Sequence, residues 1–341
     1  LPGEVPLEVE ILGVRRPLAC RAPAVRQLDD LFDEPHRRPV RQALDPVHCG
    51  TLVYFSRPTS LPFHDGSRAR RPAVSGILDR FADVRSAEPG RLLVHLPGRD
   101  AGRSASDIWR DHELLAGQIH ACGVRPNQLV VSGASNEPSG VALFLACRAL
   151  DVTLLAVDPG TTPHELTELG DRFQAAALAL PAGAGSALTR DSASGTDVAG
   201  LTLVVRDLGV ARTYPGVALL KLSSGSTGTP KTAVATDAQL ARDGSQIIRG
   251  MGIGPDDTQI AAIPLSHSYG FSVLVMPLLL QGTPIVLRES FVPQQLPADA
   301  RTFDARRFPG VPFMFQYFLD HPPGGGWPRT LQQLVSAGAR L

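Results

Sequence analysis

The chain has 341 residues, of which 43% are hydrophobic and 19% are charged, so it is long enough to bury a large core and has an ordinary globular composition. Its 33 Lys and Arg residues balance its 33 Asp and Glu residues, which excludes a global charge that would recruit nucleic acid or an anionic membrane. The longest apolar runs fall short of a bilayer span, and no signal-peptide pattern opens the chain. We therefore expect a cytoplasmic protein with no nucleic-acid partner and no membrane span.

Residues 1–72 differ in pattern from the rest of the chain. Apolar residues alternate with polar residues and proline between Val5 and Ile11, which predicts one half-buried strand. A stretch dense in arginine and proline follows. We expect residues 1–72 to form an N-terminal extension of unknown role and residues 73–341 to form the main domain.

From residue 77 onward, predicted helices and strands alternate along the chain. Helices are predicted at 77–85, 106–122, 237–249, 271–280 and 311–319. A further helix follows the strand at 129–132 and ends at residue 150, and another begins at residue 163. Strands are predicted at 92–96, 129–132, 152–157, 176–180, 201–205, 217–222, 259–263, 284–287 and 331–336, with a surface loop at 182–200. This alternation predicts an α/β fold in which a mostly parallel sheet is covered by helices on both faces, with ligands at the carboxyl ends of its strands.

The stretch SSGSTGTPK, residues 223–231, directly follows the strand predicted at 217–222. Glycine allows the backbone N–H groups to turn inward and form an anion-binding nest. The serine and threonine hydroxyls add short, rotatable donors, and the lysine adds a positive charge. Together these features suit a polyphosphate ligand.

A Walker A loop and a solvated linker are the two alternatives for this stretch. A Walker A loop needs a glycine where Pro230 stands, and proline has no N–H to offer a phosphate, so an ordinary P-loop is rejected. A solvated Gly/Ser/Thr linker has a similar composition. The preceding strand argues against a linker, as does Lys231, because Lys221 and Lys231 are the only lysines among the 33 basic residues.

SSGSTGTPK resembles the phosphate-binding loop of the adenylate-forming (AMP-binding) superfamily, which includes acyl- and aryl-CoA synthetases, luciferases and peptide-synthetase adenylation domains. Three further stretches resemble later family motifs in the same order: PLSHSYGF at 264–271, GVPFM at 310–314 and LVSAGARL at 334–341. Upstream, residues 123–147 resemble the first βα unit of the family. The resemblance covers about residues 74 to 341.

The resemblance implies the N-terminal subdomains of an adenylate-forming enzyme, with mostly parallel sheets covered by helices. It also implies ATP-dependent activation of a small carboxylic acid to acyl-AMP, with Mg²⁺ bridging phosphate oxygens and pyrophosphate leaving. CoA or the phosphopantetheine thiol of an acyl carrier protein then accepts the acyl group. Because the later motifs of the family have no counterpart before Leu341, we expect the chain as given to be incomplete for catalysis.

The resemblance further implies which residues form the site. Lys231, Thr227 and His267 are the expected catalytic residues, and no protein ligand to a metal is expected. The expected nucleotide-binding residues are Ser223, Ser224, Gly225, Ser226, Thr227, Gly228, Thr229, Lys231, Gly338 and Ala339. The expected acid-binding residues are His267, Tyr269, Val311, Phe313 and Ala337.

Alternatives to this interpretation remain open. From its surroundings alone, His267 is interpreted as a packed histidine in a strand-to-helix turn, and only the family resemblance favours a role at the acid. Phe271 is equally interpreted as a core residue. Peptide-synthetase adenylation domains carry an aspartate in their counterpart of residues 266–271, which here contain no acidic residue, so an amino acid would bury an unpaired ammonium. We therefore expect an acyl or aryl acid.

A non-catalytic nucleotide-binding remnant or scaffold is a further alternative. Thr232 replaces the glycine that usually follows the loop lysine in the family. Because a β-branched residue restricts the backbone, we expect the start of the next helix to be displaced.

Overall fold

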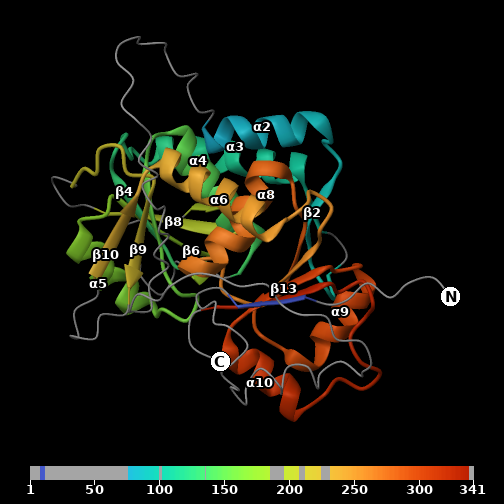
Figure 1. Ribbon diagram of the computed structural model, residues 1–341. Helices are drawn as coiled ribbons and strands as arrows, with labels where there is room; N and C mark the ends of the chain where they lie inside the picture. The colour runs from blue at the N-terminus through green and yellow to red at the C-terminus, as the bar shows by residue number, and fades with distance from the viewer. Residues whose placement is uncertain are drawn as a thin grey trace, which may run out of the picture.

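The computed structural model describes residues 8–11, 76–99, 102–134, 136–184, 196–206, 212–223 and 231–337. These residues form two seven-stranded sheets with helices packed on their faces (Figure 1). The α/β fold with mostly parallel strands is therefore confirmed. The strands belong to two sheets, however, where the alternation along the chain suggested one.

The first sheet is parallel except at one edge. Neighbouring strands pair in parallel from β1 through to β2, and β3 is antiparallel to β2. Its strands, in spatial order, are β1 (Glu8–Ile11), β14 (Gln333–Ser336), β13 (Arg307–Gly310), β11 (Gln259–Ala261), β12 (Ile285–Leu287), β2 (Leu92–His95) and β3 (Arg103–Ser104). β1 lies in the N-terminal segment for which the sequence predicted a strand, and β3 and β13 were not predicted.

The second sheet has a parallel centre and antiparallel edges. Its strands, in spatial order, are β10 (Lys231–Ala235), β9 (Leu219–Ser223), β5 (Thr153–Ala156), β4 (Leu129–Ser132), β6 (Ala177–Pro181), β8 (Leu201–Val205) and β7 (Thr196–Val198). The central strands β9, β5, β4 and β6 are parallel, whereas β10, β8 and β7 are antiparallel to their neighbours. β7 lies inside the region predicted as a surface loop.

The helices lie in three layers around these sheets. Helices α2, α4, α6 and α8 group together, α5 lies beside the second sheet, and α9 and α10 lie beside β13 of the first (Figure 1). The bounds are α2 (Ile77–Ala87), α3 (Ala105–Ala121), α4 (Pro138–Ala149), α5 (Pro163–Phe173), α6 (Asp237–Met251), α7 (Ser268–Gly270), the π-helix η2 (Phe271–Val275), α8 (Met276–Gln281), the 3₁₀ helix η3 (Pro293–Gln295), α9 (Leu296–Thr302) and α10 (Pro312–Asp320).

The hydrophobic core consists of two apolar clusters, because alternate residues of a buried strand point to opposite faces of the sheet. One apolar cluster extends from the second sheet through the central helices to the first sheet, and a smaller cluster packs α5 against the other face of the second sheet. On β9, Leu219 belongs to the first cluster and Leu220 to the second. Because successive strand residues point to opposite faces, Lys221 shares the face of Leu219 and lies toward the layer between the sheets.

The segment after residue 230 corrects our expectation for Thr232. Residues 231–235 do not enter a helix but return as β10, antiparallel to β9, and a β-branched residue such as Thr232 suits a strand. The helix begins only at Asp237. There the Thr236 hydroxyl accepts a hydrogen bond from the Gln239 N–H at 3.2 Å, and the Gln239 side chain accepts one from the Thr236 N–H at 2.9 Å.

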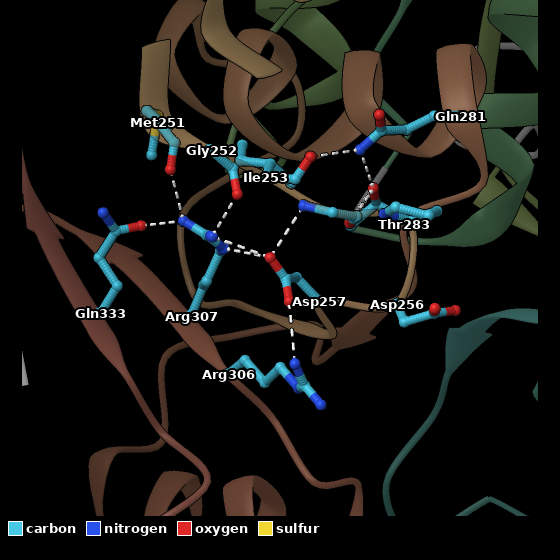
Figure 2. Close-up of polar contacts among 12 residues, drawn as sticks. Met251, Gly252, Ile253, Asp256, Asp257, Gln281, Thr283, Arg306, Arg307 and Gln333 are labelled. Carbon is cyan, nitrogen blue, oxygen red and sulfur yellow. Dashed lines mark hydrogen bonds and ion pairs between the residues drawn. The ribbon is translucent and has the colours of Figure 1, made fainter. Parts of the chain in front are cut away.

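A polar network fixes the end of α6 against the first sheet (Figure 2). The Arg307 guanidinium donates to Asp257 Oδ2 at 2.9 Å, to the Met251 carbonyl at 2.9 Å, to the Gly252 carbonyl at 2.7 Å, and to Gln333. Asp257 is only 8% exposed. The network therefore joins the last residues of α6 to the first residues of β13 and β14 through charges that are fully partnered.

Candidate active site

The expected site draws on both sheets. The glycine-rich loop, His267 and Gly338 each follow a strand. The loop follows β9 of the second sheet, whereas His267 and Gly338 follow β11 and β14 of the first. The strand ends of two sheets therefore take the place of the single sheet edge that the alternation along the chain suggested, because the order of elements along a chain does not specify which strands pair.

Charged residues at the strand ends of the second sheet nevertheless act on His267, which follows a strand of the first sheet. Lys221 on β9 acts to lower the pKa of His267, and Asp158, which follows β5, acts to raise it. His267 itself lies between β11 and α7. The candidate site therefore lies where the carboxyl ends of β5 and β9 face the carboxyl end of β11.

The His267 side chain is fixed by its own backbone. It forms the N-cap of α7, and its Nδ1 accepts a hydrogen bond from the Tyr269 N–H at 3.2 Å. In the neutral ring the proton is therefore on Nε2. Desolvation and then the charge of Lys221 lower the pKa of His267 from its ordinary value of 6.5, although the residue is exposed to solvent. At neutral pH the ring thus offers one uncharged N–H donor at the surface.

The turn that carries His267 is held tightly in place. A Cβ added at Gly270 would lie 2.1 Å from the Pro264 carbonyl oxygen, so only glycine fits there. The Leu265 N–H donates to Asn136 Oδ1 at 2.9 Å. Because Asn136 lies between β4 and α4, this buried bond ties the turn after β11 to the second sheet.

Three of the four other residues expected to bind the acid lie close together. The Tyr269 hydroxyl donates to the Val335 carbonyl at 3.2 Å, and Tyr269 is 1% exposed. The Ala337 N–H donates to the Gly310 carbonyl at 3.2 Å, next to Val311. These bonds bring the turn after β11 to the ends of β13 and β14.

Phe313, the fourth, lies apart from this group. It is 61% exposed on α10, and its ring packs edge-to-face on Phe291 with the centroids 5.8 Å apart. The helical period explains this position, because a residue two places after Val311 faces another side of the helix.

The glycine-rich stretch connects the two strands of a hairpin. Ser223 ends β9, Lys231 begins β10, and the ladder pairs these two residues directly. The other expected loop residues, Ser224, Gly225, Ser226, Thr227, Gly228 and Thr229, lie outside the described residues, as do Gly338 and Ala339. The ends of the loop are thus held together in the sheet.

A charged pair that the sequence did not reveal lies beside this hairpin. Lys221 Nζ is 4.9 Å from the centroid of the Phe271 ring, and burial lowers the pKa of Lys221 to about 8, while Asp243 acts to raise it. Burial raises the pKa of Asp243, which accepts a hydrogen bond from Ser272 at 2.8 Å. One signal was available: Lys221 is one of two lysines and lies two residues before Ser223, on the same face of β9.

A cavity of about 260 Å³ lies between the ends of β2 and β12 and the start of α4. Its charged lining is largely paired, since Arg99 bonds Glu137 at 3.0 Å and also Glu289, and Arg288 bonds Asp299 at 2.8 Å. Within the described ranges, no group of three or more His, Cys, Asp or Glu side chains is arranged to hold a metal ion. None of the described helices is long and apolar enough to cross a membrane.

Comparison with known proteins agrees with this fold. The arrangement of sheets and helices is that of the adenylate-forming enzymes. Residues 84–341 match the family model described as AMP-binding enzyme, and the chain belongs to this family.

Individual relatives and structures are distant. The chain is 26% identical over 225 residues to a feruloyl-CoA synthase of Amycolatopsis sp, covering 64% of this chain and 45% of that protein. It is 24% identical over 254 residues to a 2-succinylbenzoate–CoA ligase of Listeria innocua, and this match covers 73% of this chain and 53% of that protein. The chain thus spans about half the length of these curated relatives.

Among solved structures, o-succinylbenzoate CoA synthetase from Bacillus subtilis, in complex with its acyl-adenylate intermediate, superposes with a TM-score of 0.62. The sequence identity is 17%, and the match covers 77% of this chain and 69% of that chain. At this identity the likeness establishes the fold alone.

Proposed function

We propose that this protein uses ATP to activate a carboxylic acid. A carboxylate oxygen attacks the α-phosphorus, the bond to the leaving pyrophosphate breaks, and acyl-AMP forms. The acyl group then passes to the thiol of CoA or of a carrier-protein phosphopantetheine, and AMP leaves. The observation that carries the proposal is the SSGSTGTPK hairpin, whose preceding strand faces His267, in a chain of the AMP-binding enzyme family.

In this proposal the loop residues 224–229 and Lys231 bind the β- and γ-phosphates. Attack by an anion on an anionic centre needs positive charge and alignment, which N–H groups, hydroxyls and one ammonium supply. Phosphate oxygens are hard ligands that Mg²⁺ prefers, so the nucleotide itself would hold this ion without a protein ligand. When bound, Mg²⁺ neutralises phosphate charge. Gly338 and Ala339 are proposed to contact the adenine.

The acid is proposed to bind beside His267. The neutral ring donates its Nε2–H to the carboxylate without adding a competing positive charge. Tyr269, Val311 and Ala337 are proposed to shape the pocket next to it, whereas Phe313 lies apart on α10. The relatives named above, a feruloyl-CoA synthase and a 2-succinylbenzoate–CoA ligase, support an aryl acid and CoA as acceptor.

We further propose that residues 73–341 form the N-terminal portion of the adenylation domain and that residues 1–72 are an extension of it. The family match from residue 84 onward supports this division.

Acid-dependent exchange of labelled pyrophosphate into ATP by the full-length protein tests the proposed function. We expect exchange with aryl acids, and Lys231→Ala should lower it at least about 100-fold, because a charge aimed at the phosphates is lost. Arg249→Met, which removes an exposed cation from α6, is the matched control and should leave exchange unchanged. Exchange that persists in Lys231→Ala, or that no acid stimulates, would contradict the proposal.

A further inference from the structure

A helix begins at His267. Lys221 and Asp243 contact this helix about one turn after His267, at Phe271 and Ser272. The Phe271 N–H donates to the His267 carbonyl at 2.8 Å, so Phe271 lies one turn from His267 and Ser272 follows. His267 is exposed, whereas Phe271 and Ser272 are 4% and 2% exposed. The helix therefore runs inward from the surface, and the charged pair lies deeper than His267.

The two charges approach the helix from different elements. Lys221 reaches it from β9, with Nζ 4.9 Å from the Phe271 ring centroid. Asp243 reaches it from α6, with Oδ2 accepting from the Ser272 hydroxyl at 2.8 Å. Each charge stabilises the ionised form of the other. The ion pairs between described residues nevertheless do not include a contact between Lys221 and Asp243.

The pair therefore has hydrogen-bonding capacity to spare. An ammonium carries three N–H donors, and no described residue accepts a hydrogen bond from Lys221. Asp243 accepts through Oδ2 from Ser272, and no described donor reaches its Oδ1. Both residues are half-buried, so each loses hydration without gaining a full set of partners. Such a pair is a cost to folding unless a ligand uses it.

We propose that Lys221 and Asp243 recognise a hydroxyl group on the body of the acid. This inference rests on the proposed function. A hydroxyl oxygen accepts from the ammonium while its O–H donates to the carboxylate, so one group satisfies both residues. A second carboxylate would be repelled by Asp243, an ammonium group would be repelled by Lys221, and an apolar group would leave both unpaired.

The helix also sets where the hydroxyl lies. His267 and Phe271 are four residues apart, which corresponds to about 6 Å along a helix axis. If His267 holds the reacting carboxylate, the recognised hydroxyl lies at about this separation from it. A para-hydroxyl on a benzoate ring lies at about this separation from its carboxylate, which favours a hydroxyaryl acid as the substrate class.

Three matched acyl-adenylate mimics test the inference. Benzoyl, 4-hydroxybenzoyl and 4-carboxybenzoyl sulfamoyl adenosines are titrated calorimetrically into the full chain. We expect the 4-hydroxybenzoyl mimic to bind at least about tenfold more tightly than the benzoyl mimic, because a polar site rejects the analogue that lacks the hydroxyl. The 4-carboxybenzoyl mimic should bind no better than the benzoyl mimic.

The double variant Lys221→Met/Asp243→Leu removes both charges at similar volume. It should bind the benzoyl mimic and lose the preference for the hydroxyl, whereas the control Arg249→Met should keep that preference. A second measurement does not depend on the variant folding. Selective ¹³C labelling of lysine gives NMR signals from two side chains, Lys221 and Lys231. The 4-hydroxybenzoyl mimic should shift the Lys221 Cε resonance more than the benzoyl mimic does.

The remaining outcomes contradict the inference alone or the inference together with the proposed function. Equal affinity of wild type for the benzoyl and 4-hydroxybenzoyl mimics overturns the inference and leaves the proposed function standing. Tightest binding of the 4-carboxybenzoyl mimic overturns it in favour of an anion site, and a preference retained by the double variant places hydroxyl recognition elsewhere. An unshifted Lys221 resonance also overturns it. If none of the mimics binds, the proposed function fails together with the inference.

Discussion

Two clusters of charge in this molecule are built in opposite ways. Around Asp257, every N–H direction of Arg307 has an acceptor, and Asp257 also accepts from the Gly254 N–H at 2.8 Å and pairs with Arg306 at 3.5 Å (Figure 2). Around Lys221 and Asp243, the opposite charges attract each other without forming an ion pair.

We infer from this difference that the first cluster stabilises the fold and the second binds a ligand. A buried charge with a full set of partners fixes elements relative to one another, and Arg307 does this for α6, β13 and β14. Half-buried charges with spare donors and acceptors cost stability, and such sites are a common mark of ligand binding.

The largest effect is expected at Arg307. Arg307→Met leaves Asp257 with Arg306 as its remaining cationic partner and leaves two backbone carbonyls without their donor. We expect the free energy of unfolding to fall by about 3 kcal/mol, since breaking a buried pair exposes the cost of the remaining charge. Urea denaturation measures it, and Arg249→Met should stay within about 0.5 kcal/mol of wild type. A loss as small as that of the control would refute a structural role for the network.

Gly270→Ala should have a smaller effect on stability and a direct effect on the site. The added Cβ meets the Pro264 carbonyl oxygen at 2.1 Å, so backbone must move, at a cost of roughly 1–3 kcal/mol. Because the displaced turn carries His267, binding of the benzoyl mimic should weaken as well. Gly250→Ala, where the added Cβ meets nothing within 4 Å, is the control. Unchanged affinity in Gly270→Ala would show that the turn does not position the acid.

The most gradual effect is a pH dependence that belongs to Lys221. Its folded-state pKa of about 8 lies below the ordinary 10.5, so between these values the unfolded chain binds more protons than the folded chain. The free energy of unfolding of wild type, minus that of Lys221→Met, should therefore rise as pH increases through this window. Urea denaturation below and within the window measures this difference. Parallel pH curves for the two proteins would mean that Lys221 is not desolvated.

The sequence predicted local structure well where the apolar pattern was continuous. β4 has the predicted bounds, and α5 begins at the predicted Pro163. The division into two sheets was not predictable in this way, because strand pairing is a long-range property. β10 was missed because it is an edge strand with weak patterning, in which Val234 is 62% exposed.

The candidate site was only partly predictable for a similar reason. His267 and the loop belong to short motifs that can be read along the chain. Lys221, Asp243 and Ser272 come from three separate elements, and none of them lies in a motif that marks it as part of a pair. Their relation depends on how β9 and α6 pack on η2, which only the folded structure reveals.

The proposals assign two different ligands to neighbouring parts of the chain: the SSGSTGTPK stretch binds ATP, and Lys221 contacts the acid. Calorimetric titration of ATP into the full chain and its Lys231→Ala and Lys221→Met variants tests this division most directly. We predict that wild type and Lys221→Met bind ATP with similar affinity and that Lys231→Ala binds at least about tenfold more weakly. Equal weakening in both variants, or no binding of ATP to wild type, would contradict the account.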